Sequence, residues 1–179
     1  PMKDFTVNGV DLKKNFESVD LKGVTVSVSS VVADNFYKAE NTIDGKKDTY
    51  WHSYVRKAGE TIGLPPFTME YTFPAVTEIS GVVYVPRQDM NVGRATKYNI
   101  YASTDGTTFK KIYEGTFDYK GAVADFKPSE ASWGNTAMKA IKIETVATIS
   151  GYGTCAEITF LTGSSGTKIE NGETVKETT

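Results

Sequence analysis

The chain has 179 residues, which is enough for one domain with a full hydrophobic core and hardly enough for two. Hydrophobic residues make up 39% of it and charged residues 23%, which is typical of a soluble globular protein rather than a disordered or membrane-embedded one. The 20 basic residues are offset by 22 acidic ones, and no apolar run approaches the roughly 20 residues of a membrane span, so we expect neither a nucleic-acid partner nor membrane insertion.

The predicted elements are short β-strands separated by turn signals. Residues 1–22 mix apolar and charged types without a clear period, and we interpret them as a lead-in or a short extra strand. The runs that follow alternate apolar and polar residues or are rich in β-branched residues, as expected of strands with one or two buried faces. They predict strands at 24–28, 67–73, 79–85, 97–103, 109–115, 139–145 and 155–161. We expect a further hairpin over 117–126, around Lys120-Gly121.

The connections complete this fold prediction. The loop region 34–66 is long for a compact domain, and long ordered loops are usually functional. Pro74 is predicted to end a strand, and 128–135 to form a loop that holds Trp133. Because we find no convincing helix of ten residues and no internal repeat, about eight short strands indicate an all-β fold, an antiparallel β-sandwich or jelly roll.

The chain divides, on this interpretation, into three parts. Residues 1–22 are the lead-in, 23–162 form the domain, and 163–179 are a polar tail or linker. The first residues, Pro1-Met2-Lys3, carry no apolar signal region, so we expect no targeting peptide in the chain as given.

The residue types expected of an enzyme are thinly represented. Cys155 is the only cysteine and His52 the only histidine, so no intrachain disulfide can form, and any Ser-His-Asp or Cys-His centre would have to use His52. The sequence contains no Gly-x-Ser-x-Gly elbow, His-Glu-x-x-His motif or phosphate-binding Gly-Lys-Ser/Thr loop. We therefore expect a protein without catalytic activity.

Residues 41–52 concentrate the binding chemistry of the chain. Asp44-Gly45 is a strong turn signal, and Asp44 and Thr49 offer the hard oxygen atoms that Ca²⁺ prefers. Three large rings follow at positions 50–52, where this loop ends. The alternative interpretation is a polar loop between two strands, with Trp51 in the core.

Five motifs occur in order between about Val24 and Leu161. They are Ile43-Asp-Gly45, Thr49-x-Trp51, Tyr84-Val-Pro-Arg87, Tyr98-x-Ile-Tyr-x-Ser-x-Asp-Gly106 and Ala156-Glu-Ile158. Together they resemble the discoidin fold, that is, the coagulation factor V/VIII C-type domains, and most of all the family 32 carbohydrate-binding modules. The resemblance implies an eight-stranded, galactose-binding-domain-like jelly-roll sandwich with loops clustered at one end.

The resemblance also implies a structural Ca²⁺ site that joins the first long loop to the last strand. Carried over by position, its ligands are the carbonyls of Asn41, Lys46 and Ala156, the carboxylates of Asp44 and Glu157, and the carbonyl and hydroxyl of Thr49. A carboxylate at the start of a core strand needs a partner, which a cation would supply. The alternative is that Glu157 pairs with a lysine.

A shallow carbohydrate site near the cation is a further implication. Carried over by position, His52, Arg87 and Asn91 would bond to sugar hydroxyls, and the ring of Tyr152, between two glycines, would stack on the apolar face of the sugar. Tyr54 is a second candidate for sugar contact. The sequence departs from the family pattern in one loop, because Asn91 lies four residues after Arg87 instead of five.

Each of these residues also has a structural interpretation. His52 could bond to a backbone group and hold its loop, Arg87 could pair with Asp89, and Tyr152 could pack on the edge of the sandwich. Trp51 is expected in the core.

On this basis we expect a non-catalytic, lectin-like module that recognises a terminal sugar of the galactose or N-acetylgalactosamine type. It would be a monomeric part of a larger bacterial protein, secreted or at the cell surface (extracellular or periplasmic), with neighbouring domains. The alternatives are a protein- or phospholipid-binding discoidin domain and a structural spacer of a multidomain enzyme. Phospholipid binders of this family usually carry a disulfide and exposed apolar residues among basic ones, whereas this chain has one cysteine and no excess of basic residues.

Overall fold

The computed structural model describes the backbone of residues 2–7, 10–117, 119, 126–170 and 173–177 and the side chains of 16–117, 119 and 126–163. The strands are β1 (Met2–Val7), β2 (Val10–Ser18), β3 (Thr25–Val28), β4 (Trp51–His52), β5 (Phe67–Val85), β6 (Ala95–Ser103), β7 (Lys110–Thr116), β8 (Ser129–Thr148), β9 (Thr154–Cys155), β10 (Glu157–Glu170) and β11 (Glu173–Glu177). Two short 3₁₀ segments, η1 (Ala39–Ile43) and η2 (Ile149–Gly151), are the helical elements of this part of the chain. Neither is long and apolar enough to span a membrane.

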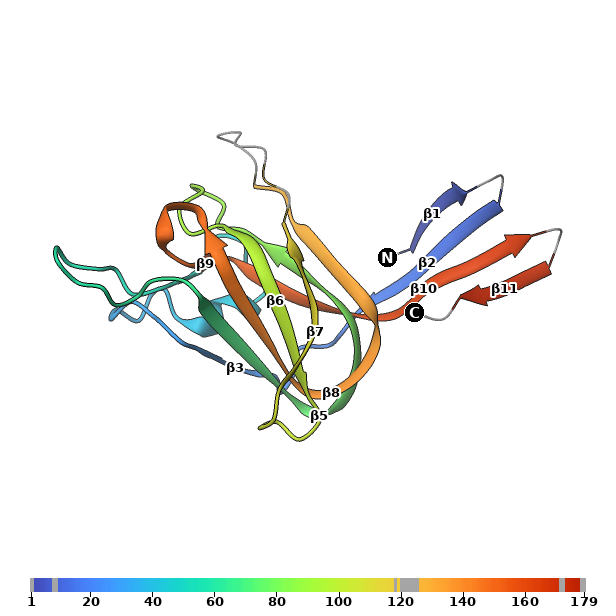
Figure 1. The fold of residues 1–179 in the computed structure, drawn as a ribbon, viewed down its shortest axis with the longest axis horizontal. Coiled ribbons are helices and arrows are strands. Elements are labelled where there is room, and N and C mark those ends of the chain that lie inside the picture. The colour runs from blue at the N-terminus through green and yellow to red at the C-terminus, as the bar shows by residue number, and fades with distance from the viewer. Residues whose placement is uncertain (1, 8–9, 118, 120–125, 171–172, 178–179) are drawn as a thin grey trace.

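The strands form an antiparallel β-sandwich, which confirms the predicted fold class. The main sheet has the order β1-β2-β10-β5-β8-β6-β7, with β3 paired to β5 and β11 to β10, and a separate two-stranded ladder joins β4 and β9. Figure 1 shows the long strands β5 and β8 curving together through the body of the molecule, with the loops between β4 and β5 and before β9 at one end. The predicted hairpin over 117–126 lies, apart from its ends, outside the described residues.

Strand β5 corrects one prediction, because it continues through Pro74 rather than ending there. Proline has no N–H to donate to a ladder. The pairing of β5 with β8 shifts register between Thr72 and Thr77, so Pro74 sits where the ladder is interrupted and its missing N–H costs no hydrogen bond. The two strands predicted at 67–73 and 79–85 are therefore one bent strand.

The loop predicted at 128–135 is also wrong, because these residues belong to β8 from Ser129 onward. Their alternation is interrupted by an irregularity opposite Ile79 and Gly81, which weakens the strand pattern in the sequence. Trp133 is half-buried, and its indole N–H donates to the carbonyl of Ile79 at 3.1 Å.

The two ends of the chain lie side by side in strands. β1 pairs with β2, β10 pairs with β11, and β10 also pairs with β2. In Figure 1 these two hairpins extend away from the sandwich. The division of the chain at 22/23 and 162/163 stays a prediction.

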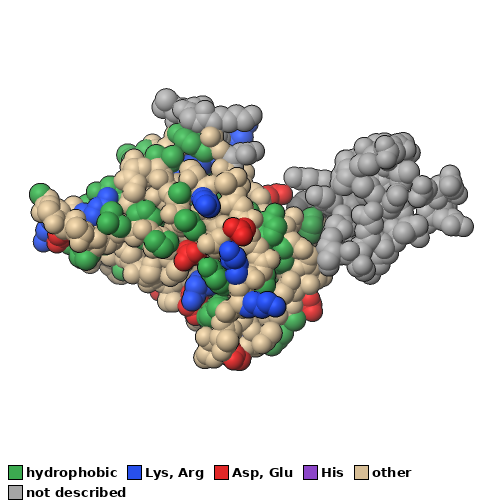
Figure 2. Space-filling view, in the orientation of Figure 1, with side chains coloured by type: hydrophobic (Ala, Val, Ile, Leu, Met, Phe, Trp, Pro, Cys, Tyr) green, Lys and Arg blue, Asp and Glu red, His purple; other side chains and the backbone are tan. Residues whose placement is uncertain are grey.

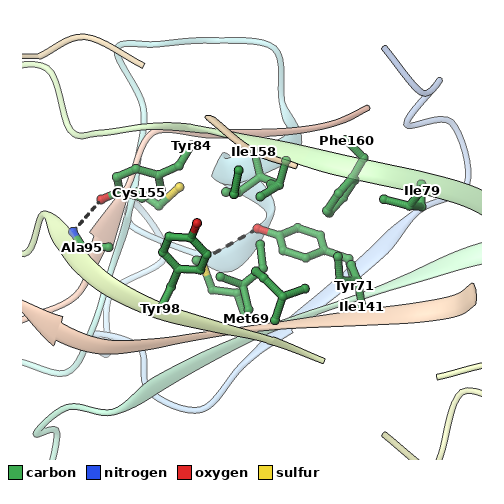
Figure 3. Packing of buried hydrophobic residues seen from close by; sticks show 14 of the residues in the cluster. Met69, Tyr71, Ile79, Tyr84, Ala95, Tyr98, Ile141, Cys155, Ile158 and Phe160 are labelled. Carbon is green, nitrogen blue, oxygen red and sulfur yellow. Dashed lines mark hydrogen bonds between the residues drawn. The ribbon is translucent and has the colours of Figure 1, made fainter. Parts of the chain in front are cut away.

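The core lies between the layers and is rich in aromatic rings, shown in Figure 3. The rings of Tyr71 and Phe160 pack edge to face with centroids 5.2 Å apart, and the hydroxyl of Tyr71 shares a hydrogen bond with that of Thr42 at 2.7 Å. Tyr84 crosses the core toward the loop end of the sandwich. Its hydroxyl donates to the carbonyl of Thr154 at 2.8 Å and accepts from the N–H of Ala95 at 3.1 Å. Buried hydroxyls thus reach partners on other elements, as buried polar groups must.

The Tyr84→Phe substitution tests this connection. It keeps the ring but removes the hydroxyl that joins the starts of β9 and β6, so we expect a loss of about 1–3 kcal/mol in the free energy of unfolding, measured by urea denaturation. Tyr101→Phe is the matched control, because the Tyr101 hydroxyl lies 3.4 Å from Glu144 on a half-buried surface. Equal losses in the two variants would contradict the structural role of the Tyr84 hydroxyl.

Candidate functional site

The site is built on the ladder between β4 and β9, in which His52 pairs with Thr154 and Trp51 with Cys155. Trp51 is 1% exposed, and its indole N–H donates to the carbonyl of Ser30 at 2.9 Å, so it lies in the core as expected. Two further hydrogen bonds continue the ladder, from the N–H of Ser53 to the carbonyl of Gly153 and from the N–H of Gly153 to the hydroxyl of Ser53.

Gly153 has to be a glycine for this ladder to form. A Cβ at this position would lie 2.6 Å from the ring of Trp51 and 2.8 Å from that of Phe67. The backbone before β9 therefore lies directly on buried rings, and the adjacent Tyr152 is held beside His52.

His52 and Tyr152 form an aromatic pair, with ring centroids 5.6 Å apart and planes at 49°. Both side chains are half-buried. The Nδ1 of His52 lies 2.7 Å from the carbonyl oxygen of Ser53, which can only accept, so Nδ1 carries the proton and Nε2 keeps its lone pair. Burial lowers the pKa of His52 below its ordinary value, and the nearby Arg87 lowers it further. The imidazole is therefore neutral at pH 7.

Arg87 is buried and forms an ion pair with Asp89 through Nε and Nη2, which is the pairing considered as its structural alternative. The hydrogen bond from Arg87 lowers the pKa of Asp89. The guanidinium also lies 4.3 Å from the ring centroid of Tyr50, which stacks on Tyr37 at 4.8 Å. These contacts fix the orientation of Arg87 near His52.

Arg56 also belongs to this cluster, although no sequence motif indicated it. Its guanidinium lies 4.4 Å from the ring centroid of Tyr152. Its Nη1 donates to the carbonyls of Gly63 at 2.6 Å and Gly151 at 3.1 Å. Arg56 therefore ties the loop before β5 to the loop that carries Tyr152. Tyr37, which faces His52 with centroids 6.4 Å apart, was also missed.

The remaining predicted sugar contacts lie at the edge of the cluster. Asn91 is half-buried in a loop that is bonded to the segment around β9, because the N–H of Thr154 donates to the carbonyl of Gly93. The hydroxyl of Tyr54 donates to the carboxylate of Glu60 at 3.0 Å, within its own loop. The role of every predicted residue in binding stays a prediction.

Two carboxyl groups meet where the first long loop reaches the start of β10. The backbone N–H of Lys46 lies 2.9 Å from the carboxylate of Asp44 and 3.1 Å from that of Glu157. The hydroxyl of Thr49 donates to Asp44. The structure thus brings together four of the predicted cation ligands. In the described side chains no lysine ammonium lies within ion-pair distance of Glu157.

The surroundings of these two carboxyl groups shift their pKa values in opposite directions. Glu157 is 8% exposed, and its burial together with the neighbouring Asp44 raises its pKa to about 8. Burial also opposes the ionisation of Asp44, but hydrogen bonds from Glu157, Thr49 and the Lys46 N–H outweigh it and lower the pKa of Asp44. Two carboxyl groups this close cannot both ionise readily without a positive partner.

The other two predicted ligands border the pair. Asn41 is buried, and its side-chain amide donates to the carbonyls of Phe36 and Tyr50, which holds the turn of η1. Ala156 is fully buried next to Glu157, and its N–H donates to the carbonyl of Val85. The donor set consists of two carboxylates, a hydroxyl and backbone carbonyls. Oxygen donors of these kinds suit a hard cation such as Ca²⁺ rather than a softer metal.

Solved structures share this fold. A family 32 carbohydrate-binding module of Clostridium perfringens NanJ, in complex with galactose, has 22% identity and a TM-score of 0.69, over 82% of this chain and 99% of that one. A second C. perfringens module, in complex with GalNAc-β-1,3-galactose, has 23% identity and a TM-score of 0.71, over 82% of this chain and 100% of that one.

Curated relatives are much longer proteins. A galactose oxidase of Gibberella zeae is 33% identical over 73 residues, which are 40% of this chain and 10% of that protein. An A type blood N-acetyl-α-D-galactosamine deacetylase of Flavonifractor plautii is 26% identical over 123 residues, 67% of this chain and 14% of that protein. The chain therefore spans about a tenth of the length of these relatives. The sequence model of the F5/8 type C domain matches residues 25–158, well over half of the chain, and the chain thus belongs to the F5/8 type C domain family.

Proposed function

We propose that this domain is a non-catalytic carbohydrate-binding module that holds a terminal sugar of the galactose type. The observation that carries the proposal is the His52–Tyr152 pair, in which a neutral imidazole with a free Nε2 lies beside a half-buried tyrosine ring. A pyranose presents an apolar face of C–H bonds and a rim of hydroxyls, which this combination of ring and acceptor matches. The similar modules in complex with galactose and GalNAc-β-1,3-galactose support the choice of sugar.

Each side chain then has a distinct role. Tyr152 stacks on the apolar face of the sugar, and Nε2 of His52 accepts from a hydroxyl. Arg87, oriented by Asp89 and Tyr50, supplies N–H donors that the ion pair leaves over. Asn91 adds a contact from the neighbouring loop. One stacked ring with three or four hydrogen bonds corresponds to a Kd of roughly 10 μM to 1 mM, or about −4 to −7 kcal/mol.

Such an affinity suits a domain attached to a larger protein. Tethered modules gain binding by avidity rather than by the strength of one site. The relatives are many times longer than this chain, and one similar C. perfringens protein combines two such modules with an M60 catalytic domain. The domain would therefore act as a monomeric targeting unit of a secreted or surface-attached bacterial protein.

A structural Ca²⁺ is the second part of the proposal. Asp44 and Glu157 would hold it together with Thr49 and the carbonyls of Asn41, Lys46 and Ala156. Ca²⁺ supplies the positive charge that the two facing carboxyl groups need, and it takes about six to eight oxygen ligands of this kind. The chain itself contributes the turn of η1 and the start of β10, which bring these oxygens together.

Removal of the sugar-facing side chains tests the site. We expect His52→Ala and Tyr152→Ala each to weaken binding of methyl galactoside at least about tenfold, or about 1.4 kcal/mol, in isothermal titration calorimetry, because each removes a contact that the other cannot replace. Tyr113→Ala is the matched control, since Tyr113 is an exposed tyrosine on β7. Unchanged affinity in both site variants, or no binding to any glycan on an array, would refute the carbohydrate site.

The pH dependence of binding tests the role of the imidazole. Because burial keeps the folded pKa of His52 below 6.5, the acceptor Nε2 persists from pH 7.5 to 6.5, and we expect constant affinity there. Below the folded pKa, protonation removes the acceptor, and affinity falls by up to about tenfold per pH unit. His52 is the only histidine, so the residual binding of His52→Gln should not follow this profile. Affinity that rises on acidification would contradict the acceptor role.

Calcium dependence of stability tests the cation site. At a Ca²⁺ concentration 100 times its Kd, binding to the folded state adds about 2.7 kcal/mol, so EDTA should lower the melting temperature. Glu157→Gln should abolish this response, whereas Asp48→Asn, an exposed carboxylate of the same loop, should retain it. A melting temperature that is the same in Ca²⁺ and EDTA would exclude the site, whatever the outcome of the sugar experiments.

A further inference from the structure

A hollow lies between the end of β3 and the loop that precedes β5. Its volume is about 410 Å³, within the range of small-molecule sites. We refer to it as the arm groove, because the segment between β4 and β5 projects from the sandwich like an arm in Figure 1. The arm groove is lined by Ser29, Ser30, Val31, Tyr54, Ile62, Gly63, Leu64, Pro66 and Phe67.

Apolar side chains that line the arm groove are exposed to solvent. Ile62 is 59% exposed, Leu64 49% and Val31 41%. Five of the eight large apolar side chains that are exposed in the described part of the chain fall between residues 31 and 64. Figure 2 shows hydrophobic side chains along this end of the molecule. Exposed apolar side chains that cluster on a protein surface often mark a site of ligand contact.

The floor of the arm groove offers hydroxyl groups. Ser29 and Ser30 each accept one backbone N–H, from Thr68 and Tyr54, both at 2.9 Å. Each hydroxyl can still donate its own proton and has a second lone pair. Tyr54 also lines the groove, and its ring is positioned by the hydrogen bond from its hydroxyl to Glu60. A Cβ at Gly63 would lie 3.2 Å from the Cβ of Tyr54, so this position favours glycine.

The arm groove is continuous with the proposed sugar site through Arg56. Nη1 of this residue bonds to the carbonyl of Gly63, which lines the groove, and to the carbonyl of Gly151, which precedes Tyr152. The guanidinium itself lies on the Tyr152 ring. A ligand that extends from the Tyr152 ring toward Gly63 would therefore pass the Arg56 side chain and reach the arm groove.

We propose that the arm groove holds the second residue of the bound glycan, the one to which the terminal sugar is linked. This inference rests on the proposed function, since it needs the terminal sugar at His52 and Tyr152. Apolar walls with hydroxyl donors at the floor match a pyranose, which has an apolar face and a hydroxyl rim, better than a purely aliphatic chain. Arg56, with the donors of Nε and Nη2, faces the glycosidic linkage between the two residues.

Calorimetry with a series of galactosides tests the proposal. The probes are methyl β-galactoside, β-1,3- and β-1,4-linked galactosyl disaccharides, and octyl β-galactoside. We expect at least one disaccharide to bind about fivefold or more tightly than methyl β-galactoside, because the second residue adds contacts without a second loss of translational freedom. Ile62→Asp should remove this gain and leave the affinity for methyl β-galactoside unchanged.

Val76→Asp is the matched control, because Val76 is also 59% exposed but lies on β5 away from the arm groove. It should keep the disaccharide gain. Methyl resonances of Ile62, Leu64 and Val31, followed by NMR, should shift with the disaccharide and not with methyl β-galactoside.

The outcomes separate this proposal from the proposed function. If methyl β-galactoside binds but no disaccharide binds more tightly, or if Ile62→Asp keeps the gain, the arm groove is not a sugar subsite while the terminal site stands. If octyl β-galactoside gains as much as the best disaccharide, the groove takes an apolar aglycon and the proposal is wrong. If no probe binds at all, both the terminal site and the arm groove are refuted.

Discussion

The short ladder between β4 and β9 is the interaction on which the binding end of this domain depends. It contains only two residues on each side, and it is stabilised mainly by the burial of Trp51 against Phe67 and the close backbone at Gly153. A Cβ at Gly153 would push β9 away from these rings. The position of His52 and Tyr152 is thus determined by core packing, and not by contacts between the two side chains themselves.

The same ladder brings the two carboxylates together. Asp44 lies shortly before β4 and Glu157 shortly after β9, so pairing of the two strands also closes the distance between the η1 turn and β10. Burial of Glu157 beside Asp44 opposes the ionisation of Glu157, so a carboxylate at this position is unfavourable without a positive partner. A bound Ca²⁺ would therefore stabilise the same ladder that positions the sugar-facing residues, and the cation and sugar sites would be coupled through folding rather than through direct contact.

The strands could be predicted from the sequence where apolar and polar residues alternate, as in 67–73 and 97–103, because this alternation indicates a strand with one buried face. The sequence was insufficient where the ladder is irregular: nothing local shows that Pro74 falls at a register shift, or that the polar run around Trp133 pairs with Ile79. The candidate site divides in the same way. His52 and Tyr152 were predicted from the resemblance to the family, whereas Arg56 lies over the Tyr152 ring because of the path of an irregular loop, which has no period to detect.

This division has a physical consequence for ligand recognition. His52 lies on β4, Tyr152 lies just before β9, and Arg87 is fixed by its ion pair with Asp89, so little conformational entropy is lost when a sugar binds to these residues. The arm groove is formed on one side by a loop that is held by Arg56, by the bond between Tyr54 and Glu60, and by the bond from the Tyr54 N–H to Ser30. A loop held by few bonds can change length and sequence without disturbing the ladder. The sandwich would therefore determine which terminal sugar binds. The loop would determine which second sugar residue is accepted in the arm groove.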